Sequence, residues 1–255
     1  MTHRILILGG TGDARTIAAR LAARGDCAVT LSLAGRTAEP VAQGVPVISG
    51  GFGGAEGLAA HLVGERVSLL VDATHPYAAR MSANAAAAAR RARVPLLALR
   101  RPAWQAVAGD RWTIVADVDA AAAALAGPPR RVFLTLGRNE VHAFEAAPRN
   151  AYLIRSVDAV EPPLGVPDAR YILARGPFGE AAEAELMAAE RIDVLVSKNS
   201  GGSATVGKIA AARRLGVEVV MIDRPVLPDV PSAAAVDDLM DMIAHRLASA
   251  EKRGV

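Results

Sequence analysis

The feature that most constrains this 255-residue chain is a short apolar run that ends in glycines and leads into a helical pattern. Residues 5–8 read Ile-Leu-Ile-Leu, residues 9–12 read Gly-Gly-Thr-Gly, and apolar residues at helical spacing follow over 17–22. This order of strand, tight turn and helix is typical of a dinucleotide-binding unit. Glycines let the backbone approach a pyrophosphate, which then faces the N–H groups and positive dipole end of the helix. The residues predicted to bind a cofactor here are Gly9, Gly10, Thr11, Gly12, Asp13 and Ala14.

The spacing of these glycines departs from the usual G-x-G-x-x-G pattern. With Gly10 and Gly12 as the first two glycines, Arg15 occupies the place of the third. Counting from Gly9 instead gives G-x-x-G, with the same Arg15 three residues further on. A flavodoxin-like domain can have a similar turn without a nucleotide, so this stretch alone leaves that alternative open.

The end of the second predicted strand, residues 27–34, favours a phosphorylated dinucleotide. An Asp or Glu at that point would bind the ribose 2′-hydroxyl of NAD, whereas an Arg accommodates the 2′-phosphate of NADP. This chain has no acidic residue there and instead has Ser32, Gly35 and Arg36. Because a guanidinium matches phosphate geometry, the sequence predicts NADPH as the cofactor. The alternative is that Arg36 is a solvated loop residue.

Strand and helix patterns alternate along the rest of the chain, and this predicts an α/β fold. Apolar residues make up 52% of the chain, and alanine runs such as 85–89 suit helices that lie on a sheet. The pattern is interrupted at residues 100–104, Arg-Arg-Pro-Ala-Trp. We therefore expect two Rossmann-like domains, each a mostly parallel sheet with helices on both faces. Residues 1–100 would form the NADPH-binding domain, and residues 101–255 a second domain that contributes to the substrate cleft.

Composition argues against several classes of protein. The formal net charge is only +3 and aromatic residues make up 4% of the chain, so nucleic acid is a poor candidate partner. The single cysteine, Cys27, excludes an internal disulfide framework, and the histidines lack metal-ligand spacing. No signal peptide and no bilayer-spanning apolar segment is evident, so we expect a soluble cytoplasmic protein that binds neither membrane nor metal.

Distinctive residues follow the strand predicted at 67–72. The segment 72–77 reads Asp-Ala-Thr-His-Pro-Tyr, and proline suits the first turn of a helix. Thr74 and His75 would then lie either against the nicotinamide end of the cofactor or at a helix cap, and the sequence does not separate these roles. Asp72 is interpreted as structural. The predicted catalytic residues are Thr74, His75 and Tyr77, of which Thr74 and His75 would also contact the cofactor and Tyr77 the substrate.

A second group of polar residues suits an anionic substrate. The segment 197–202 reads Ser-Lys-Asn-Ser-Gly-Gly, but it lacks the spacing of a P-loop. A lysine charge with nearby amide and hydroxyl groups suits a carboxylate. Tyr-x-x-x-Lys and G-x-S-x-G motifs are both absent, which argues against a short-chain dehydrogenase and an α/β-hydrolase. Besides Tyr77, the residues predicted to bind substrate are Arg138, Arg175, Lys198, Asn199, Ser200, Gly201 and Lys208.

Five segments together extend over nearly the whole chain. They are Leu-Gly-Gly-Thr-Gly-Asp at 8–13, Ala-Gly-Arg at 34–36, Asp-Ala-Thr-His-Pro-Tyr-Ala at 72–78, Gly-Pro-Phe at 176–178 and Ser-Lys-Asn-Ser-Gly-Gly at 197–202. In this order they resemble the precorrin-6A reductase family of cobalamin biosynthesis. Asp13 stands where many relatives have Glu, which is a mild departure.

The resemblance implies NADPH-dependent reduction of one macrocycle double bond of precorrin-6A, giving precorrin-6B, with the substrate between two Rossmann-like domains. Hydride would go to a carbon made electrophilic by conjugation and a proton to its neighbour, so that the protein mainly positions and neutralises its ligands. Tyr77, His75 or water would deliver the proton.

Two alternatives stay open at this point. One is a reductase that acts on the cobalt-containing precorrin-6A of the anaerobic route. The other is a non-catalytic NADP-sensing Rossmann protein, which would bind NADPH without turnover. The expected partner is a small-molecule tetrapyrrole, and transient contact with neighbouring pathway enzymes is compatible with this role.

Overall fold

The computed structural model describes residues 2–33 and 44–251. The chain forms two compact units. The first unit comprises the residues up to Arg101 together with those from Pro225 onward, and the second unit runs from Pro102 to Arg224. Each unit contains one six-stranded sheet whose paired strands are all parallel.

The first sheet has the strand order β12-β5-β4-β1-β2-β3. Its strands are β1 (His3–Leu8), β2 (Cys27–Leu33), β3 (Val47–Ser49), β4 (Leu69–Asp72), β5 (Leu96–Leu99) and β12 (Ser232–Ala233). From β1 the chain builds outward through β2 and β3, and it then returns to place β4 on the other side of β1. This reversal makes the carboxyl ends of β1 and β4 the topological switch point, where open α/β sheets bind their ligands.

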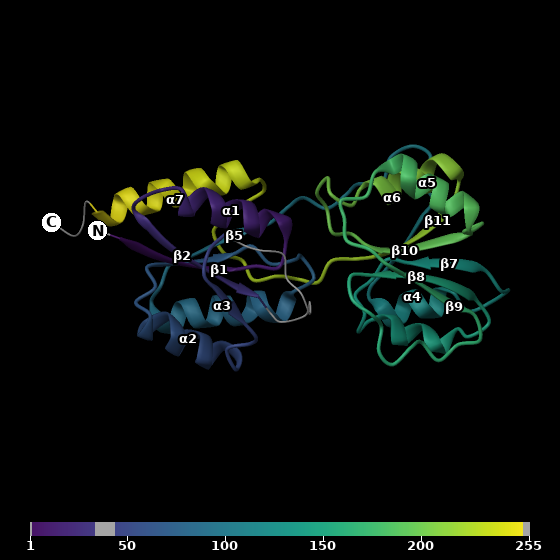
Figure 1. The fold of residues 1–255 in the computed structure, drawn as a ribbon, viewed down its shortest axis with the longest axis horizontal. Helices are drawn as coiled ribbons and strands as arrows, with labels where there is room; N and C mark the ends of the chain where they lie inside the picture. The colour runs from purple at the N-terminus through teal and green to yellow at the C-terminus, as the bar shows by residue number, and fades with distance from the viewer. Residues whose placement is uncertain (1, 34–43, 252–255) are drawn as a thin grey trace. The chain divides into compact units, whose positions relative to one another are not determined.

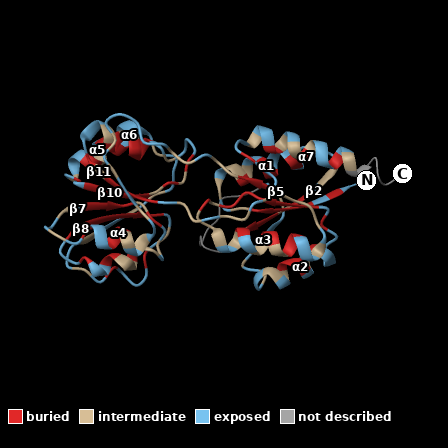
Figure 2. Ribbon diagram, turned by 180° about the vertical axis from the view of Figure 1, so that it is seen from behind, coloured by how far each residue is buried: buried red, intermediate tan, exposed pale blue. Residues whose placement is uncertain are grey.

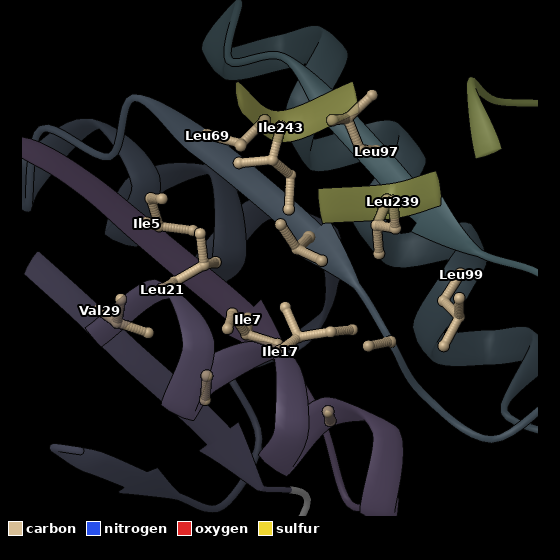
Figure 3. Packing of buried hydrophobic residues seen from close by; sticks show 14 of the residues in the cluster. Ile5, Ile7, Ile17, Leu21, Val29, Leu69, Leu97, Leu99, Leu239 and Ile243 are labelled. Atoms are coloured by element: carbon tan, nitrogen blue, oxygen red, sulfur yellow. The ribbon is translucent and has the colours of Figure 1, made fainter. Parts of the chain in front are cut away.

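Helices cover both faces of the first sheet (Figure 1). One face carries α1 (Gly12–Ala22) and α7 (Val236–Glu251), and the other carries α2 (Gly54–Gly64) and α3 (Ala79–Ala92). Strand β1 serves both layers because its side chains alternate: Ile5 and Ile7 pack toward α1 and α7, as Figure 3 shows. Leu6 and Leu8 pack toward α2 and α3. Each of these fully buried side chains contributes roughly 1.5–3 kcal/mol of transfer free energy.

The second sheet repeats this design with the order β6-β11-β10-β7-β8-β9. Its strands are β6 (Trp112–Val115), β7 (Arg131–Leu134), β8 (Ala151–Ser156), β9 (Ala169–Leu173), β10 (Val194–Lys198) and β11 (Glu218–Ile222). Helices α5 (Glu180–Ala189) and α6 (Gly207–Leu215) lie on one face, and α4 (Val118–Ala124) and the 3₁₀ helix η1 (Val141–Ala146) lie on the other. From β7 the chain builds outward through β8 and β9, and it then returns to place β10 on the other side of β7. The carboxyl ends of β7 and β10 therefore form the switch point of this sheet. Figure 2 shows the central strands of each sheet as buried.

The predicted fold class, with two parallel sheets covered by helices, is confirmed, but the C-terminal segment corrects the predicted division of the chain. Residues 225–255 were expected in the second domain, whereas β12 pairs with β5 of the first sheet. Helix α7 packs its apolar stripe on that sheet through Leu239, Ile243 and Leu247. The stripe predicts a core-facing helix, but its period does not say which sheet it covers. Within the described residues, no helix has the length and apolar character to cross a membrane.

Candidate functional site

The turn between β1 and α1 joins the two strands of the first switch point. Thr11 is the N-cap of α1, and its hydroxyl oxygen accepts a hydrogen bond of 3.1 Å from the Ala14 N–H. The same hydroxyl donates to the Ala73 carbonyl just after β4, at 3.0 Å. One side chain therefore caps the helix and ties the ends of β1 and β4 together.

The glycines of this turn have separate roles. A Cβ on Gly9 would lie 2.6 Å from Cδ1 of Leu31, so Gly9 allows the close approach of the turn to β2. Gly10 has a φ of +107°, which disfavours a side chain. A Cβ on Gly12 would meet only Nη2 of Arg15, at 3.8 Å. Close packing is thus provided at Gly9, and this explains why an arginine is tolerated where the usual motif has its third glycine.

The remaining predicted cofactor residues of the first unit lie along this edge, as far as they are described. Asp13, in the first turn of α1, forms an ion pair of 3.2 Å with Arg101. Ser32 is buried near the end of β2, and its carbonyl accepts the Gly9 N–H at 2.9 Å. Gly35 and Arg36 lie outside the described residues, so the 2′-phosphate contact stays a prediction.

Asp72 forms a buried polar cluster at the end of β4. Its carboxylate accepts hydrogen bonds from the hydroxyls of Thr74 and Ser82, each at 2.6 Å, and from Arg100 at 2.8 Å. Burial alone would raise the pKa of Asp72, but the charge of Arg100 and these hydrogen bonds outweigh it and lower the pKa. Asp72 is therefore ionised, and it fixes the position of Thr74.

The segment after Thr74 forms a turn before the helix begins. The Ala78 N–H donates to the His75 carbonyl at 2.8 Å, and α3 starts at Ala79 with no side-chain cap. The expectations that Pro76 opens the helix and that Thr74 or His75 caps it are therefore wrong. Nδ1 of His75 accepts the Tyr77 N–H at 3.3 Å, and the two half-buried rings lie 5.6 Å apart. In the neutral imidazole this bond leaves the proton on Nε2.

Lysine and carboxylate side chains meet at the switch point of the second sheet. Lys198, the last residue of β10, forms an ion pair of 2.5 Å with Glu140. Glu140 also accepts the Gly137 N–H in the loop after β7, at 3.0 Å. Arg138 in the same loop lies 3.9 Å from Asp158 and is partly exposed, and Arg175 is exposed after β9.

Lys208 lies at the start of α6 and is 94% buried, with a relative exposure of 6%. Its Nζ donates to the Thr135 hydroxyl at 2.9 Å, and that hydroxyl in turn donates to the Val196 carbonyl at 2.9 Å. Among the described residues, no carboxylate forms an ion pair with Lys208. Burial, followed by the positive charge of Arg155, lowers the pKa of Lys208 to about 7.

A buried ion pair whose charges act on Lys208 was not anticipated from the sequence. Arg155, in β8, makes a two-pronged pair with Glu183 of α5, with one N–O distance of 2.8 Å. The Arg155 guanidinium lies 3.7 Å from the ring centroid of Phe178 and 4.9 Å from that of Phe133. The only sequence signal was an arginine that interrupts the apolar strand 151–156.

Asn199 and Gly201, in the predicted substrate loop, contact the backbone of the segment that contains Pro102 and Trp104. The side-chain amide of Asn199 accepts the Trp104 N–H at 2.8 Å and donates to the Trp104 carbonyl at 2.9 Å. A Cβ on Gly201 would lie 2.2 Å from the Pro102 carbonyl oxygen. These contacts position the loop that follows Lys198, and Ser200 is half-buried within it. The structure thus gives Asn199 and Gly201 a local structural role.

These features define a class: an α/β protein of two Rossmann-like sheets, with a glycine turn at one switch point and two lysines at the other. A family model described as "Precorrin-6x reductase CbiJ/CobK" matches residues 4–244. This chain belongs to that family, the precorrin-6x reductases.

Individual relatives are similar in sequence to this chain over nearly their full length. The precorrin-6A reductase of Sinorhizobium sp is 57% identical over 97% of this chain and 95% of its own. The precorrin-6A reductase of Rhodobacter capsulatus is 48% identical over 99% of each chain. A solved structure, "CobK precorrin-6A reductase", has a TM-score of 0.91 and 48% identity, covering 96% of this chain and 97% of its own. The protein is accordingly a reductase with a role in cobalamin biosynthesis.

Proposed function

We propose that this protein catalyses the NADPH-dependent reduction of one macrocycle double bond of precorrin-6A, giving precorrin-6B. The observation that carries the proposal is the full-length similarity to proteins named precorrin-6A reductases, at up to 57% identity. The glycine turn at the first switch point and the lysines at the second are compatible with the two kinds of binding site that such a reaction needs.

The cofactor is proposed to bind at the first switch point. The N–H groups of Gly12 and Asp13 at the start of α1 would meet the pyrophosphate, and Arg36 would meet the 2′-phosphate. When bound, NADPH supplies the hydride. Thr74 is held at this edge by Asp72, and His75 and Tyr77 follow it, so these three residues would adjoin the nicotinamide. The Nε2–H of His75, the Tyr77 hydroxyl or a water molecule would donate the proton.

The tetrapyrrole carboxylates are proposed to bind at the second switch point. Lys198 and Lys208 lie there, and Arg138 and Arg175 follow strands at the same edge of the sheet. A buried ammonium without a carboxylate partner is costly, and a ligand carboxylate would remove that cost. The identities favour the metal-free substrate, because the cobalt-precorrin-6A reductase of Priestia megaterium is only 29% identical. We expect the enzyme to act in the cytoplasm, with transient contacts to neighbouring pathway enzymes.

The direct test is to mix the purified protein with NADPH and precorrin-6A and to follow absorbance at the nicotinamide band. We expect NADPH to be consumed in proportion to the substrate added. Binding of NADPH without consumption would instead support the NADP-sensing alternative. Consumption only with cobalt-precorrin-6A would move the protein to the anaerobic route.

Two variants separate the proposed sites. Arg36→Ala should weaken NADPH binding about 10-fold or more and leave NADH binding nearly unchanged, since only the 2′-phosphate contact is lost. Lys198→Ala should weaken precorrin-6A binding by a similar factor and leave NADPH binding intact. Arg20→Ala is a matched control for charge, because Arg20 pairs with Asp237 at the opposite end of α1. Equal losses for NADPH and NADH in Arg36→Ala would remove the 2′-phosphate argument.

A further inference from the structure

The charges around Lys208 do not balance. Arg155 of β8 is matched by Glu183 of α5, and Lys198 of β10 is matched by Glu140. Lys208 is the third cation of this group, and its Nζ hydrogen-bonds only to the neutral Thr135 hydroxyl among the described residues. The unmatched positive charge therefore belongs to the most buried member of the cluster.

Lysine is rare in this chain, and two of its lysines lie at the switch point of the second sheet. Lysine and arginine together number 29, yet the only lysines are Lys198, Lys208 and Lys252. Two of the three lie at the switch point of the second sheet, and Lys252 lies outside the described residues. Arginine stays charged at any physiological pH, whereas a buried lysine can give up its proton. A lysine at this position thus allows the site to be neutral when it is empty.

The groups that act on Lys208 favour this neutral form. Burial is the largest cause that lowers the pKa of Lys208, and the positive charges of Arg155 and Lys198 lower it further. The negative charge of Glu183 raises it. Together they lower the pKa of Lys208 to about 7, so that charged and neutral forms coexist near neutral pH. A carboxylate brought next to Nζ would reverse the balance, because an opposite charge favours the protonated amine.

We propose that Lys208 takes up a proton from solvent when a substrate carboxylate binds beside it, and that Arg155 and Glu183 are the positioning residues that set this coupling. The step forms one N–H bond: the neutral amine and a solvated proton give an ammonium that pairs with the ligand carboxylate. No other bond changes, and no oxidant or reductant is needed. The inference rests on the proposed function only in taking a polycarboxylate tetrapyrrole as the ligand.

The coupling is testable by calorimetry without turnover. Precorrin-6A is titrated into the protein without NADPH, at about pH 7.5, in buffers that differ in ionisation enthalpy. On binding the ligand, the wild type should take up more protons than Lys208→Arg, by a substantial fraction of one proton per molecule. The arginine of Lys208→Arg is already charged and cannot lose its proton. Lys252→Arg, at the one lysine that is not assigned to the proposed site, is the control for the exchange itself and should retain the uptake.

The outcomes separate this inference from the proposed function. If precorrin-6A does not bind the wild type at all, the proposed substrate is wrong. If it binds and the wild type takes up no more protons than Lys208→Arg, the coupling is wrong and the site is a fixed cation. Agreement between the wild type and Lys252→Arg, with loss of uptake in Lys208→Arg, assigns the proton to Lys208.

The positioning role is tested by NMR on protein labelled with ¹³C in its lysine side chains, of which there are three. In the free protein the Lys208 signal should titrate near neutral pH. Glu183→Gln leaves the Arg155 charge unopposed, so the Lys208 midpoint should move down by about one pH unit. A midpoint that stays in place in folded Glu183→Gln would remove the role assigned to the pair. Should that variant fail to fold, Glu183→Asp, which keeps the charge, should leave the midpoint close to its wild-type value, and a large downward shift there would contradict the role.

Discussion

Five strands of each sheet share one order, but the two sheets place different groups at their switch points. At the first switch point, two acidic side chains are matched by arginines: Asp72 is paired with Arg100 and Asp13 with Arg101. A phosphate arriving there would meet backbone N–H groups and a helix dipole. At the second switch point, no carboxylate among the described residues pairs with Lys208. We therefore expect the first site to bind an anion through the backbone and the second to bind it through side chains.

This difference suits the chemistry of the two proposed ligands. A pyrophosphate has a fixed shape, and a rigid glycine turn can be built to match it. Carboxylates on a macrocycle are dispersed, so side chains that reach them from several strands are more useful. Both units nevertheless bury an arginine–carboxylate pair near the site: Arg100 with Asp72, and Arg155 with Glu183. Such pairs hold neighbouring polar groups in defined positions.

The largest effect should come from breaking the matched pair of the first unit. Arg100→Met leaves the fully buried Asp72 carboxylate with only hydroxyl and N–H donors. We expect the free energy of unfolding at pH 7 to fall by about 4 kcal/mol, as when one partner of a buried ion pair is removed. Chemical denaturation measures this loss. Arg91→Met, which breaks the exposed pair with Glu56, is the control and should cost less than about 1 kcal/mol.

The pH dependence of Arg100→Met sharpens this test. The folded-state pKa of Asp72 is lowered, so its contribution to stability is present above the unfolded value of 3.8 and is lost as the pH falls through the folded pKa. In the variant, burial is no longer opposed by Arg100, and the pKa of Asp72 should rise. The stability gap between wild type and variant should therefore narrow as the pH falls into the acidic range. A constant gap would show that Arg100 acts through packing alone.

At the second switch point, removal of a buried charge is expected to raise the free energy of unfolding instead of lowering it. Lys208 has a folded pKa of about 7 against an ordinary value of 10.5, so the unfolded state binds more protons between these two values. Wild-type stability should rise with pH across that window, and the penalty for burying the ammonium is complete below pH 7. Lys208→Met removes the charge, and we expect it to stabilise the protein by about 3 kcal/mol near pH 6. Denaturation from about pH 6 to pH 10 should show this gain decline, and a destabilised variant would contradict it.

Much of this arrangement follows from local patterns in the sequence. The alternation of strands and helices predicted both sheets. The glycine turn and Lys198 were predicted at strand ends, and the structure places them there. Lys198 and Lys208 were predicted together, and they do lie at one edge of the second sheet. The domain break at residues 100–104 was also visible, because a proline and two arginines interrupt the pattern there.

Partners distant in sequence were not predictable in the same way. Arg100 and Arg101 were seen only as part of a break, whereas the structure pairs them with Asp72 and Asp13. Asn199 fits a substrate loop by composition, but its amide binds Trp104, which lies 95 residues earlier. Likewise, the apolar stripe of α7 does not reveal that it covers the first sheet. Periodicity fixes which face of an element is buried, and only the assembled fold shows what buries it.

The smallest expected effect concerns the hydroxyl that links β1 to β4. Thr11→Ala removes both the N-cap of α1 and the bond to the Ala73 carbonyl, and we expect a loss of about 1 kcal/mol in the free energy of unfolding. Thr11→Ser keeps the hydroxyl and should lose less than half as much. Because the cap also fixes the turn that is proposed to bind pyrophosphate, Thr11→Ala should weaken NADPH more than precorrin-6A, measured by fluorescence titration. Equal weakening of both ligands would mean that the turn acts on the fold as a whole. It would also contradict the assignment of NADPH to the first switch point and precorrin-6A to the second.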